Sequence, residues 1–293
     1  ITDKDHRAII VLAGTPRDEG WSHVVTQASE FLVSLREEGI RTSAFPEDFF
    51  SHRRGEFIAI ACGVSHGTRR TRPGNLQHPP ERQTLVSAML DNEFIRRIAG
   101  FQSSAFSYFA PKLYAHYCKK LLCLFKRDQK LQRNFEGSIF PGVSVNLGPT
   151  TVALDHTDAG NVAYGLCALT PLGSFDDSKG GYLILFDLGL LIQFPAGSVI
   201  LLPSGVLRHG NTPILAGEER MSIAQYCAGG LLRWVDYGFK QAKRLSKKQK
   251  LVVDGDHNER VQEALSLFSR VDELEADRRS TFCTFKTFLR SFF

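Results

Sequence analysis

The sequence predicts an α+β fold in which a β-rich core is flanked by helices. Between residues 140 and 230, short apolar runs follow one another with Gly and Pro turns between them, a pattern typical of a β-sandwich or barrel. Before and after this stretch, apolar residues recur at helical spacing. We expect one compact unit with an N-terminal α/β segment at 1–139, the core at 140–230 and a C-terminal helical segment at 231–293.

The N-terminal segment alternates strand and helix patterns. Its first helical run is closed by Gly39, a residue typical of the position after a helix C-terminus. A Gly- and Pro-rich basic stretch at 63–80 predicts a loop. In order, the predicted elements are a strand at 7–12, a helix at 23–38, a strand at 57–62, the loop, and helices at 85–99 and 105–125.

The core is predicted from β-rich runs separated by turn residues, and the helices after it from amphipathic runs. The turns include Gly148-Pro149 and Gly180-Gly181. The predicted strands lie at 143–147, 151–154, 162–169, 182–186, 190–194, 198–202 and 221–226, and the predicted helices at 234–245 and 260–272.

Composition excludes several classes of protein. Hydrophobic residues make up 43% of the 293 residues, enough for a sizeable core. No apolar run is long enough to cross a bilayer, so we expect no membrane partner. The six cysteines form no C-x-x-C pair, which argues against a structural zinc cluster. Most lie in apolar stretches and are expected to be buried free thiols in a reducing compartment: Cys62, Cys118, Cys123, Cys167, Cys227 and Cys283.

An H-x-D pair, His156 and Asp158 in LDHTDAGN, stands at the end of a predicted strand. Alternate residues of an extended backbone share a face, so the imidazole and the carboxylate point the same way. His209 in PSGVLRHGN supplies a third ligand. Two His and one carboxylate on one face of iron(II) leave positions open for a chelating co-substrate and O2, whereas a zinc hydrolase needs fewer open positions.

Arg220 and Ser222, in ERMSIAQY, occupy alternate positions on a later strand. A planar guanidinium beside a hydroxyl suits a carboxylate held by paired hydrogen bonds, and in jelly-roll oxygenases that carboxylate is the far end of 2-oxoglutarate. Each feature alone has an ordinary explanation, because H-x-D arises by chance, a lone His on a strand is usually a core residue and a lone Arg is usually solvated. Their order, spacing and strand context together favour iron and 2-oxoglutarate.

The core resembles the TET/JBP family of nucleic-acid dioxygenases, and most closely its short fungal-type members. The resemblance is carried by NLGPTTVALDHTDAGNVAYGLCAL, GGYLILFDLGLLIQFPAGSVILLPSGVLRHGN and RMSIAQY. It implies a double-stranded β-helix (jelly roll) that uses Fe(II), 2-oxoglutarate and O2 to oxidise a methyl group on a DNA base, most often 5-methylcytosine. The implied products are hydroxymethyl, formyl and carboxyl forms, on the route to DNA demethylation. The family's metal ligands and co-substrate clamp correspond to the five residues named above.

The resemblance also implies two contacts to the base. Asn161 stands where the 5-methylcytosine oxidases place an amide that hydrogen-bonds the base, and Tyr226 where they place a ring that stacks on it. Where those enzymes often have a base-contacting His, this chain has Ala228, a departure that bears on the choice of pyrimidine. The cysteine-rich zinc region of the animal enzymes is missing from this sequence. From the residues alone, Asn161 is equally explained as a turn residue and Tyr226 as a core residue.

Oxidation of a base in duplex DNA requires that the nucleotide be flipped out of the stack, and phosphate affinity comes from basic surface. The loop residues Arg69, Arg70 and Arg72 are the predicted DNA contacts, because a flexible basic loop can grip a groove. A C-terminal basic run can instead serve nuclear import, and we expect a nuclear protein. The three basic clusters, each of which is otherwise a solvated face, are Arg53, Arg54, Arg69, Arg70 and Arg72; Lys126, Arg127, Lys130 and Arg133; and Lys240, Lys243, Arg244, Lys247, Lys248 and Lys250.

Three other functions stay open from the sequence. The first keeps the chemistry but changes the base, to N6-methyladenine or a thymine methyl in DNA or RNA. The second is an oxygenase of proteins or small molecules, and the third is a non-catalytic binding module, against which the complete ligand set argues. No obligate protein partner is expected. Formaldehyde release, nucleic-acid binding and succinate production distinguish these functions in turn.

Overall fold

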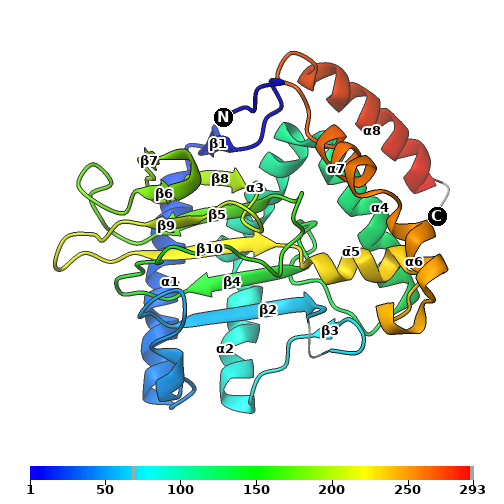
Figure 1. Ribbon diagram of the computed structural model, residues 1–293. Coiled ribbons are helices and arrows are strands. Elements are labelled where there is room, and N and C mark those ends of the chain that lie inside the picture. Colours follow the sequence, from blue (N-terminus) through cyan, green and yellow to red (C-terminus); the bar gives the residue numbers. More distant parts are fainter. Residues whose placement is uncertain (68–69, 291–293) are drawn as a thin grey trace.

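The computed structural model describes residues 1–67 and 70–290, with side chains up to residue 282. Two β-sheets occupy one side of the molecule, and the helices that follow them gather on the other (Figure 1). Three N-terminal helices cover one face of the larger sheet. The helices are α1 (Trp21–Arg41), α2 (Pro80–Asp91), α3 (Glu93–Phe109), α4 (Pro111–Arg127), α5 (Gly229–Asp236), α6 (Lys247–Asp254), α7 (His257–Ser266) and α8 (Leu274–Arg290), with 3₁₀ turns at Glu47–Phe49, Phe186–Leu188 and Ala242–Arg244.

The described strands form one seven-stranded and one three-stranded sheet, in the orders β1-β8-β5-β10-β4-β2-β3 and β7-β6-β9. All pairings between these strands are antiparallel. Strands from the N-terminal segment therefore complete the larger sheet. The strands are β1 (Val11–Gly14), β2 (Ala59–Ser65), β3 (Gly74–Asn75), β4 (Gly142–Asn146), β5 (Cys167–Leu172), β6 (Leu183–Leu185), β7 (Leu190–Ile192), β8 (Val199–Leu202), β9 (His209–Asn211) and β10 (Met221–Tyr226).

The two faces of the larger sheet differ in polarity, as β10 shows. Side chains alternate between faces along a strand. Met221 and Ile223 lie in the apolar cluster formed with α1, α2 and α3. On the other face, Ser222 accepts a hydrogen bond of 2.8 Å from Nδ2 of Asn146, its register partner on β4. The face turned away from the N-terminal helices therefore carries polar side chains.

Buried amides fasten α3 to the sheet. Nε2 of Gln102 donates to the Thr170 hydroxyl at 2.8 Å, and Nε2 of Gln225 donates to the Ala99 carbonyl at 2.9 Å. The Ser138 hydroxyl in turn donates to Oε1 of Gln225 at 2.7 Å. Because a buried polar group without a partner is costly, this network fixes the position of β10 against α3.

The first helix is longer than the sequence predicts. It begins at Trp21 and continues to Arg41, so the prediction that Gly39 follows its C-terminus is wrong. The glycine serves packing instead, since a Cβ there would lie 2.1 Å from Cε2 of Phe45. The Phe45 ring is buried against the helix at that point.

Three helices replace the two predicted at 85–99 and 105–125. Asn92 separates α2 from α3, because its side chain accepts hydrogen bonds from the backbone N–H groups of Phe94 and Ile95 and so caps the new helix. Pro111 occupies the first turn of α4, where its missing N–H is not needed. The apolar spacing correctly predicts helices here, but it does not show where α2 ends and α3 begins, or where α3 ends and α4 begins.

The C-terminal segment forms four helices, where two were predicted. The helix predicted at 234–245 ends at Asp236, shortly before Gly238 adopts a φ of 62° in the left-handed region. The unpredicted α6 begins with a capping box formed by Ser246 and Gln249. The helix predicted at 260–272 is α7, which starts earlier because Asp256 caps it.

Two strand predictions also need correction. Residues 151–154 form no named strand; the Thr151 backbone N–H instead donates to the Arg220 carbonyl at 3.0 Å. No strand is predicted at β9, where Gly210 and Asn211 are residue types depleted in strands. The loop predicted at 63–80 contains the end of β2 and the short β3.

The thiol prediction is confirmed for the cysteines whose side chains are described. Cys62, Cys118, Cys167 and Cys227 are free and buried, and Cys123 is free and half-buried. The side chain of Cys283 lies outside the described residues. Among the described helices, none has the length and apolarity that a bilayer crossing requires.

Candidate metal centre

Backbone pairing brings together two histidines that are far apart in the sequence. The N–H of His156 donates to the carbonyl of His209 at 3.1 Å, and the N–H of His209 donates back at 2.9 Å. The Asp158 N–H donates to the Ser204 carbonyl at 2.8 Å. The segment after β4 is therefore anchored to β9 and to the turn before it, with all three predicted ligands on one side.

The three side chains converge on one point. The distance from Nε2 of His156 to Oδ1 of Asp158 is 3.8 Å, and that from Nε2 of His209 to Oδ2 of Asp158 is 3.9 Å. One ligand atom from each residue lies within 4.8 Å of the other two. Both histidines are 7% exposed, whereas the Asp158 side chain is 30% exposed. The predicted triad is thus assembled, with the carboxylate on its open side.

Each histidine is held with Nε2 directed at the centre. Nδ1 of His156 lies 2.7 Å from the carbonyl oxygen of Leu154, and Nδ1 of His209 lies 2.9 Å from that of Leu207. A carbonyl can only accept, so each Nδ1 carries the proton and each Nε2 keeps its lone pair. Burial, together with the neighbouring His209, lowers the pKa of His156, which favours the neutral imidazole that binds metal.

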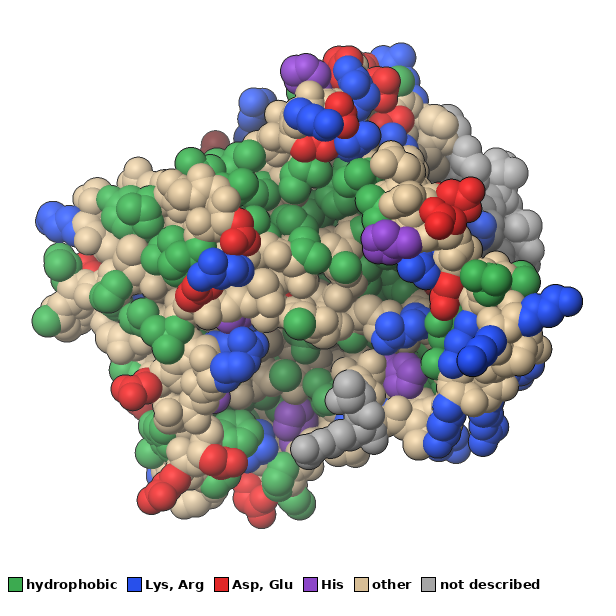
Figure 2. Space-filling model, in the orientation of Figure 1, with side chains coloured by type: hydrophobic (Ala, Val, Ile, Leu, Met, Phe, Trp, Pro, Cys, Tyr) green, Lys and Arg blue, Asp and Glu red, His purple; other side chains and the backbone are tan. Residues whose placement is uncertain are grey.

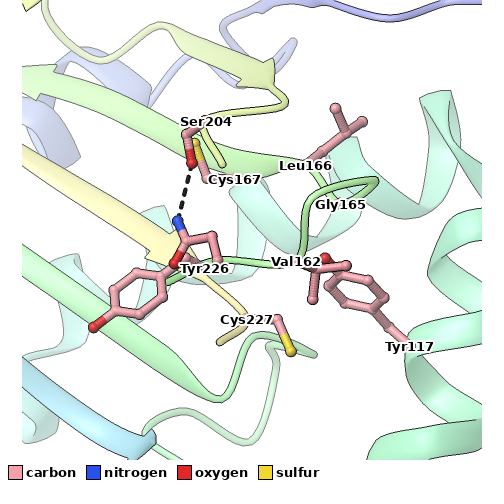
Figure 3. Close-up of a pocket in the computed structure, with 9 residues that line it drawn as sticks. Tyr117, Val162, Gly165, Leu166, Cys167, Ser204, Tyr226 and Cys227 are labelled. Carbon is pink, nitrogen blue, oxygen red and sulfur yellow. Dashed lines mark hydrogen bonds between the residues drawn. The ribbon is translucent and has the colours of Figure 1, made fainter. Parts of the chain in front are cut away.

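Asn161 lies in contact with the aspartate ligand. Its Nδ2 donates to the Ser204 hydroxyl at 2.9 Å, the bond dashed in Figure 3, and lies 3.5 Å from Oδ2 of Asp158. Its backbone N–H donates to the Asp158 carbonyl at 2.8 Å. Asn161 therefore orients the carboxylate; its predicted contact with a base stays a prediction.

Arg220 is a buried cation without an anionic partner among the described residues. It is 2% exposed, and its Nε has no hydrogen-bond partner. Burial lowers the pKa of Arg220 to about 10, so the guanidinium is still charged at neutral pH. Its plane faces the Phe175 ring at 5.8 Å. Because an unpaired buried charge is strongly unfavourable, the position favours a bound anion.

Buried polar atoms without partners lie on β4, which pairs with β10, and at Thr151, whose carbonyl accepts from Arg220. They are Oγ of Ser144, Oδ1 of Asn146 and Oγ1 of Thr151, all buried. Ser222, predicted to act with Arg220, lies beside them through its bond to Asn146. A dicarboxylate would supply acceptors to the guanidinium and the hydroxyls. The donor set therefore fits iron(II) at the triad, with open positions for O2, and 2-oxoglutarate anchored at Arg220.

Tyr226 lies in a narrow crevice that Asn161 also lines. The crevice is too small for a water molecule and is also lined by Tyr117, Cys167 and Cys227. In Figure 3 the Tyr226 ring points away from Tyr117. Burial raises the pKa of Tyr226 to about 12, so the phenol is neutral at physiological pH. A Cβ at Gly142 would lie 2.9 Å from its Cε2, so this glycine makes room for the ring.

Arg54 is a site residue that sequence reasoning missed. Burial is the largest cause of the pKa shifts of His156 and Tyr226; the positive charge of Arg54 is a smaller cause that acts to lower both pKa values, so Arg54 lies near both side chains. Its carbonyl accepts a bond of 2.8 Å from the Leu154 N–H. The sequence placed Arg54 only in a surface basic cluster, and nothing in the local pattern signalled its contact with the metal segment.

The predicted DNA contacts divide between described and undescribed residues. Arg69 lies outside the described residues. Arg70 donates to the Asn75 carbonyl at 3.2 Å, and Arg72 is exposed. Ala228, which stands where a base-contacting His is often found, is buried and pairs with Asn161 across an isolated bridge.

No protein-family model and no curated protein matches this chain. Among solved structures, NgTET1 in complex with 5mC DNA is similar over 75% of this chain and 72% of that chain, at 14% identity and a TM-score of 0.41. A 2OG-Fe(II) oxygenase-family oxidoreductase from Burkholderia pseudomallei is similar over 73% and 93%, at 16% identity and a TM-score of 0.36. A Pseudomonas putida prolyl-4-hydroxylase is similar over 75% and 91%, at 14% identity and a TM-score of 0.30. These similarities are distant, and the site geometry is the stronger indication of function.

Proposed function

We propose that this chain is an Fe(II)- and 2-oxoglutarate-dependent dioxygenase that oxidises 5-methylcytosine in DNA. The products are 5-hydroxymethylcytosine and then the formyl and carboxyl forms. One observation carries the proposal: the triad of His156, Asp158 and His209 shares a fold with Arg220, a buried cation that lacks an anion among the described residues. Metal hydrolases need the first feature but not the second.

The proposed architecture is a double-stranded β-helix. Two antiparallel sheets support this assignment, one of seven and one of three described strands. β9 of the smaller sheet carries His209, and β10 of the larger sheet carries Ser222 and directly follows Arg220. A metal bound at one sheet and a co-substrate anchored at the other would lie between the two layers.

The overall reaction is R–CH3 + 2-oxoglutarate + O2 → R–CH2OH + succinate + CO2. Bound iron(II), with 2-oxoglutarate and O2, supplies the oxidising chemistry for the C–H bond. His156, Asp158 and His209 hold the metal, with the imidazoles kept in one tautomer by Leu154 and Leu207. Arg220 and Ser222 would fix the distal carboxylate of the co-substrate.

The methylated base is the finer part of the proposal. A methyl group in duplex DNA reaches the metal only if the nucleotide is flipped out. Asn161 and Tyr226 are the proposed base contacts, since Nδ2 of Asn161 lies 3.5 Å from Oδ2 of Asp158 and Tyr226 ends β10, the strand that carries Ser222. Ala228 removes one contact typical of 5-methylcytosine oxidases, so N6-methyladenine and thymine are the competing bases. We also propose nuclear localisation, because the DNA substrate is there.

The test is incubation with Fe(II), 2-oxoglutarate and oligonucleotides that carry each methylated base, read by nucleoside mass spectrometry and succinate release. We expect 5-hydroxymethylcytosine and an equal amount of succinate. Asp158→Ala should abolish both, whereas Asp155→Ala, three residues away and ion-paired with Arg208, should retain them. Formaldehyde release from N6-methyladenine would show that this base, and not 5-methylcytosine, is the substrate. Hydroxylation of a peptide or small molecule with no product on DNA would refute the proposal.

A further inference from the structure

Three basic segments that are distant in the sequence lie together in the fold. They are residues 70–72, 126–133 and 240–250, whose Lys and Arg residues we call the basic rim. Most of these side chains are exposed. Residues 240–250 contain no acidic residue. In Figure 2, Lys and Arg side chains gather over α6 at one end of the visible face.

Specific contacts join the three segments. Nε2 of Gln241 donates to the Thr71 carbonyl at 2.7 Å, which ties the C-terminal segment to the loop. Nδ2 of Asn75, at the end of that loop, donates to the Lys130 carbonyl at 2.8 Å. The guanidinium of Arg127 lies 5.7 Å from the Phe239 ring centroid. Every pair of the three segments is therefore joined by a contact between the segments themselves or their immediate neighbours. The basic rim is one continuous surface.

Chain neighbours of the basic rim line a large groove that leads to the metal segment: Gly67 shortly precedes residues 70–72, and Tyr237 shortly precedes residues 240–250. The groove has a volume of about 1090 Å³, and Figure 2 shows the hollow between the sheets and the C-terminal helices. Ala159, Gly160 and Asn161, which directly follow the ligand Asp158, line one side. His66 lines it from the basic loop, and its Nδ1 lies 3.0 Å from the Gly230 carbonyl. This volume exceeds the roughly 300–1,000 Å³ of small-molecule pockets, so the groove suits an extended ligand.

The interior of the groove is mixed in charge, unlike its rim. Asp236 is ion-paired with Lys120, and Asp254 accepts a bond of 3.0 Å from the Tyr237 hydroxyl. Glu263 also lines the groove, as do the cations Arg233 and Arg260.

Rings line the metal side of the same groove. Nε2 of His116 lies 3.2 Å from the Tyr164 hydroxyl, and the two rings meet edge to face. A positive rim beside a groove with aromatic walls is the arrangement that holds phosphates outside and bases inside.

We infer that the basic rim binds the phosphate backbone of DNA and directs an unpaired stretch of the strand along the groove toward Asp158. This inference deepens the proposed function and rests on it for the nature of the ligand. The new element is the binding surface: the whole basic rim, and not the loop at 70–72 alone, holds the DNA backbone. It also chooses between the two roles that the sequence left open for residues 240–250, which were phosphate binding and nuclear import.

The test is DNA binding by fluorescence anisotropy, with unmethylated single-stranded and duplex oligonucleotides, across a series of salt concentrations. The rim variant is Lys243→Glu, Arg244→Glu and Lys247→Glu combined; all three residues are exposed. The matched control makes the same charge change at Lys4, Arg17 and Arg96, which are exposed and outside the rim. Circular dichroism and the melting temperature verify that both variants are folded.

We expect the rim variant to bind at least tenfold more weakly and to lose about two to three from the slope of log K against log salt, since each phosphate contact adds about 0.7–0.9. The control should change affinity less than threefold. Equal losses in both variants, or wild-type affinity in the rim variant, would overturn the inference, as would a wild-type protein that does not bind DNA. Rim-dependent binding without oxidation of methylated DNA would support the surface and refute the proposed function instead.

Discussion

The Arg220 guanidinium has one hydrogen-bond acceptor among the described residues, the carbonyl oxygen of Thr151, and that bond is long at 3.4 Å. Arg36 makes a contrast within the same chain. It is also buried, but its Nη2 lies 2.7 Å from Oε1 of Glu219 and its Nη1 donates to the Leu147 carbonyl at 2.8 Å. Arg36 is paired within the fold, whereas Arg220 has no anionic partner among the described residues.

Replacing Arg220 with Met should separate stability from co-substrate binding. The change removes an uncompensated buried charge at similar volume, so the free energy of unfolding of the ligand-free protein should stay the same or rise. Binding of 2-oxoglutarate, measured anaerobically by calorimetry on the Mn(II)-loaded protein, should weaken at least 100-fold. Thermal melting of the ligand-free protein gives the stability.

Arg36→Met is the matched control for this prediction. It removes the partner of Glu219 and leaves the Leu147 carbonyl without its donor, so it should lower the free energy of unfolding by about 1–3 kcal/mol. A large destabilisation by Arg220→Met, with 2-oxoglutarate affinity unchanged, would mean that Arg220 is a structural residue.

Asn161→Ala should weaken metal binding as well as any contact to a base. Loss of the bonds to Ser204 and Asp158 frees the carboxylate ligand, and loss of such an orienting group typically lowers metal affinity about 10–100-fold. Competition with a chelator for Co(II) or Mn(II) measures this directly. Asn134→Ala, a half-buried amide outside the site, is the control. An unchanged metal affinity with a higher KM for methylated DNA would show that Asn161 contacts only the base.

Tyr226 can be tested by removing the ring or only its hydroxyl. If the ring stacks on the base, Tyr226→Phe should retain kcat/KM for methylated DNA within a few-fold. Tyr226→Ala should lower it about 10–100-fold, since stacking contributes about 1–3 kcal/mol per base. Affinity for 2-oxoglutarate serves as the internal control and should be unchanged. Equal activity of all three proteins would reduce the ring to a core residue.

The buried thiols should resist alkylation in the native protein. Burial raises the pKa of Cys62, Cys118 and Cys167 to about 12 in each case, so almost no thiolate, the reactive form, is present at pH 8. Mass spectrometry after iodoacetamide treatment should find these sites unmodified until urea is added, with Cys123, which is half-buried, modified earlier.

The same shifts set a pH dependence of stability. Between the ordinary thiol pKa near 9 and about 12, the unfolded chain releases protons that the native protein retains. The free energy of unfolding should therefore fall as the pH rises through that range. Urea titrations at pH 8 and pH 10 measure it, and a stability that increases over this interval would contradict the burial of the thiols.

The candidate ligands could be picked out from the sequence because each stands in a short pattern that suits its chemistry. His156 and Asp158 share a face by alternation, and Arg220 and Ser222 do the same. Most strands of the core were also found, because they are β-branched or leucine-rich runs between turns. The sequence could not reveal that His156 pairs with His209, since strand register depends on contacts between distant segments.

The errors have two physical origins. The boundary at Asn92 depends on a local side-chain cap to Phe94 and Ile95, which apolar spacing does not register. The position of Gly39 inside α1 depends on the Phe45 ring from outside the helix, and the meeting of the basic segments depends on bonds such as Gln241 to Thr71. These last two are tertiary contacts, which no short window of sequence contains.

The reciprocal backbone bonds between His156 and His209 have a consequence for how the chain can vary. The spacing of the two imidazoles is set by one rung of a ladder, so it does not depend on the length of chain that separates them. Insertions in the turn at Ser178 and Lys179, which are exposed, should therefore leave the donor atoms in place. A library of loop lengths grafted there would retain metal affinity while the outer surface diversifies, which makes this turn a natural point for engineering new substrate contacts.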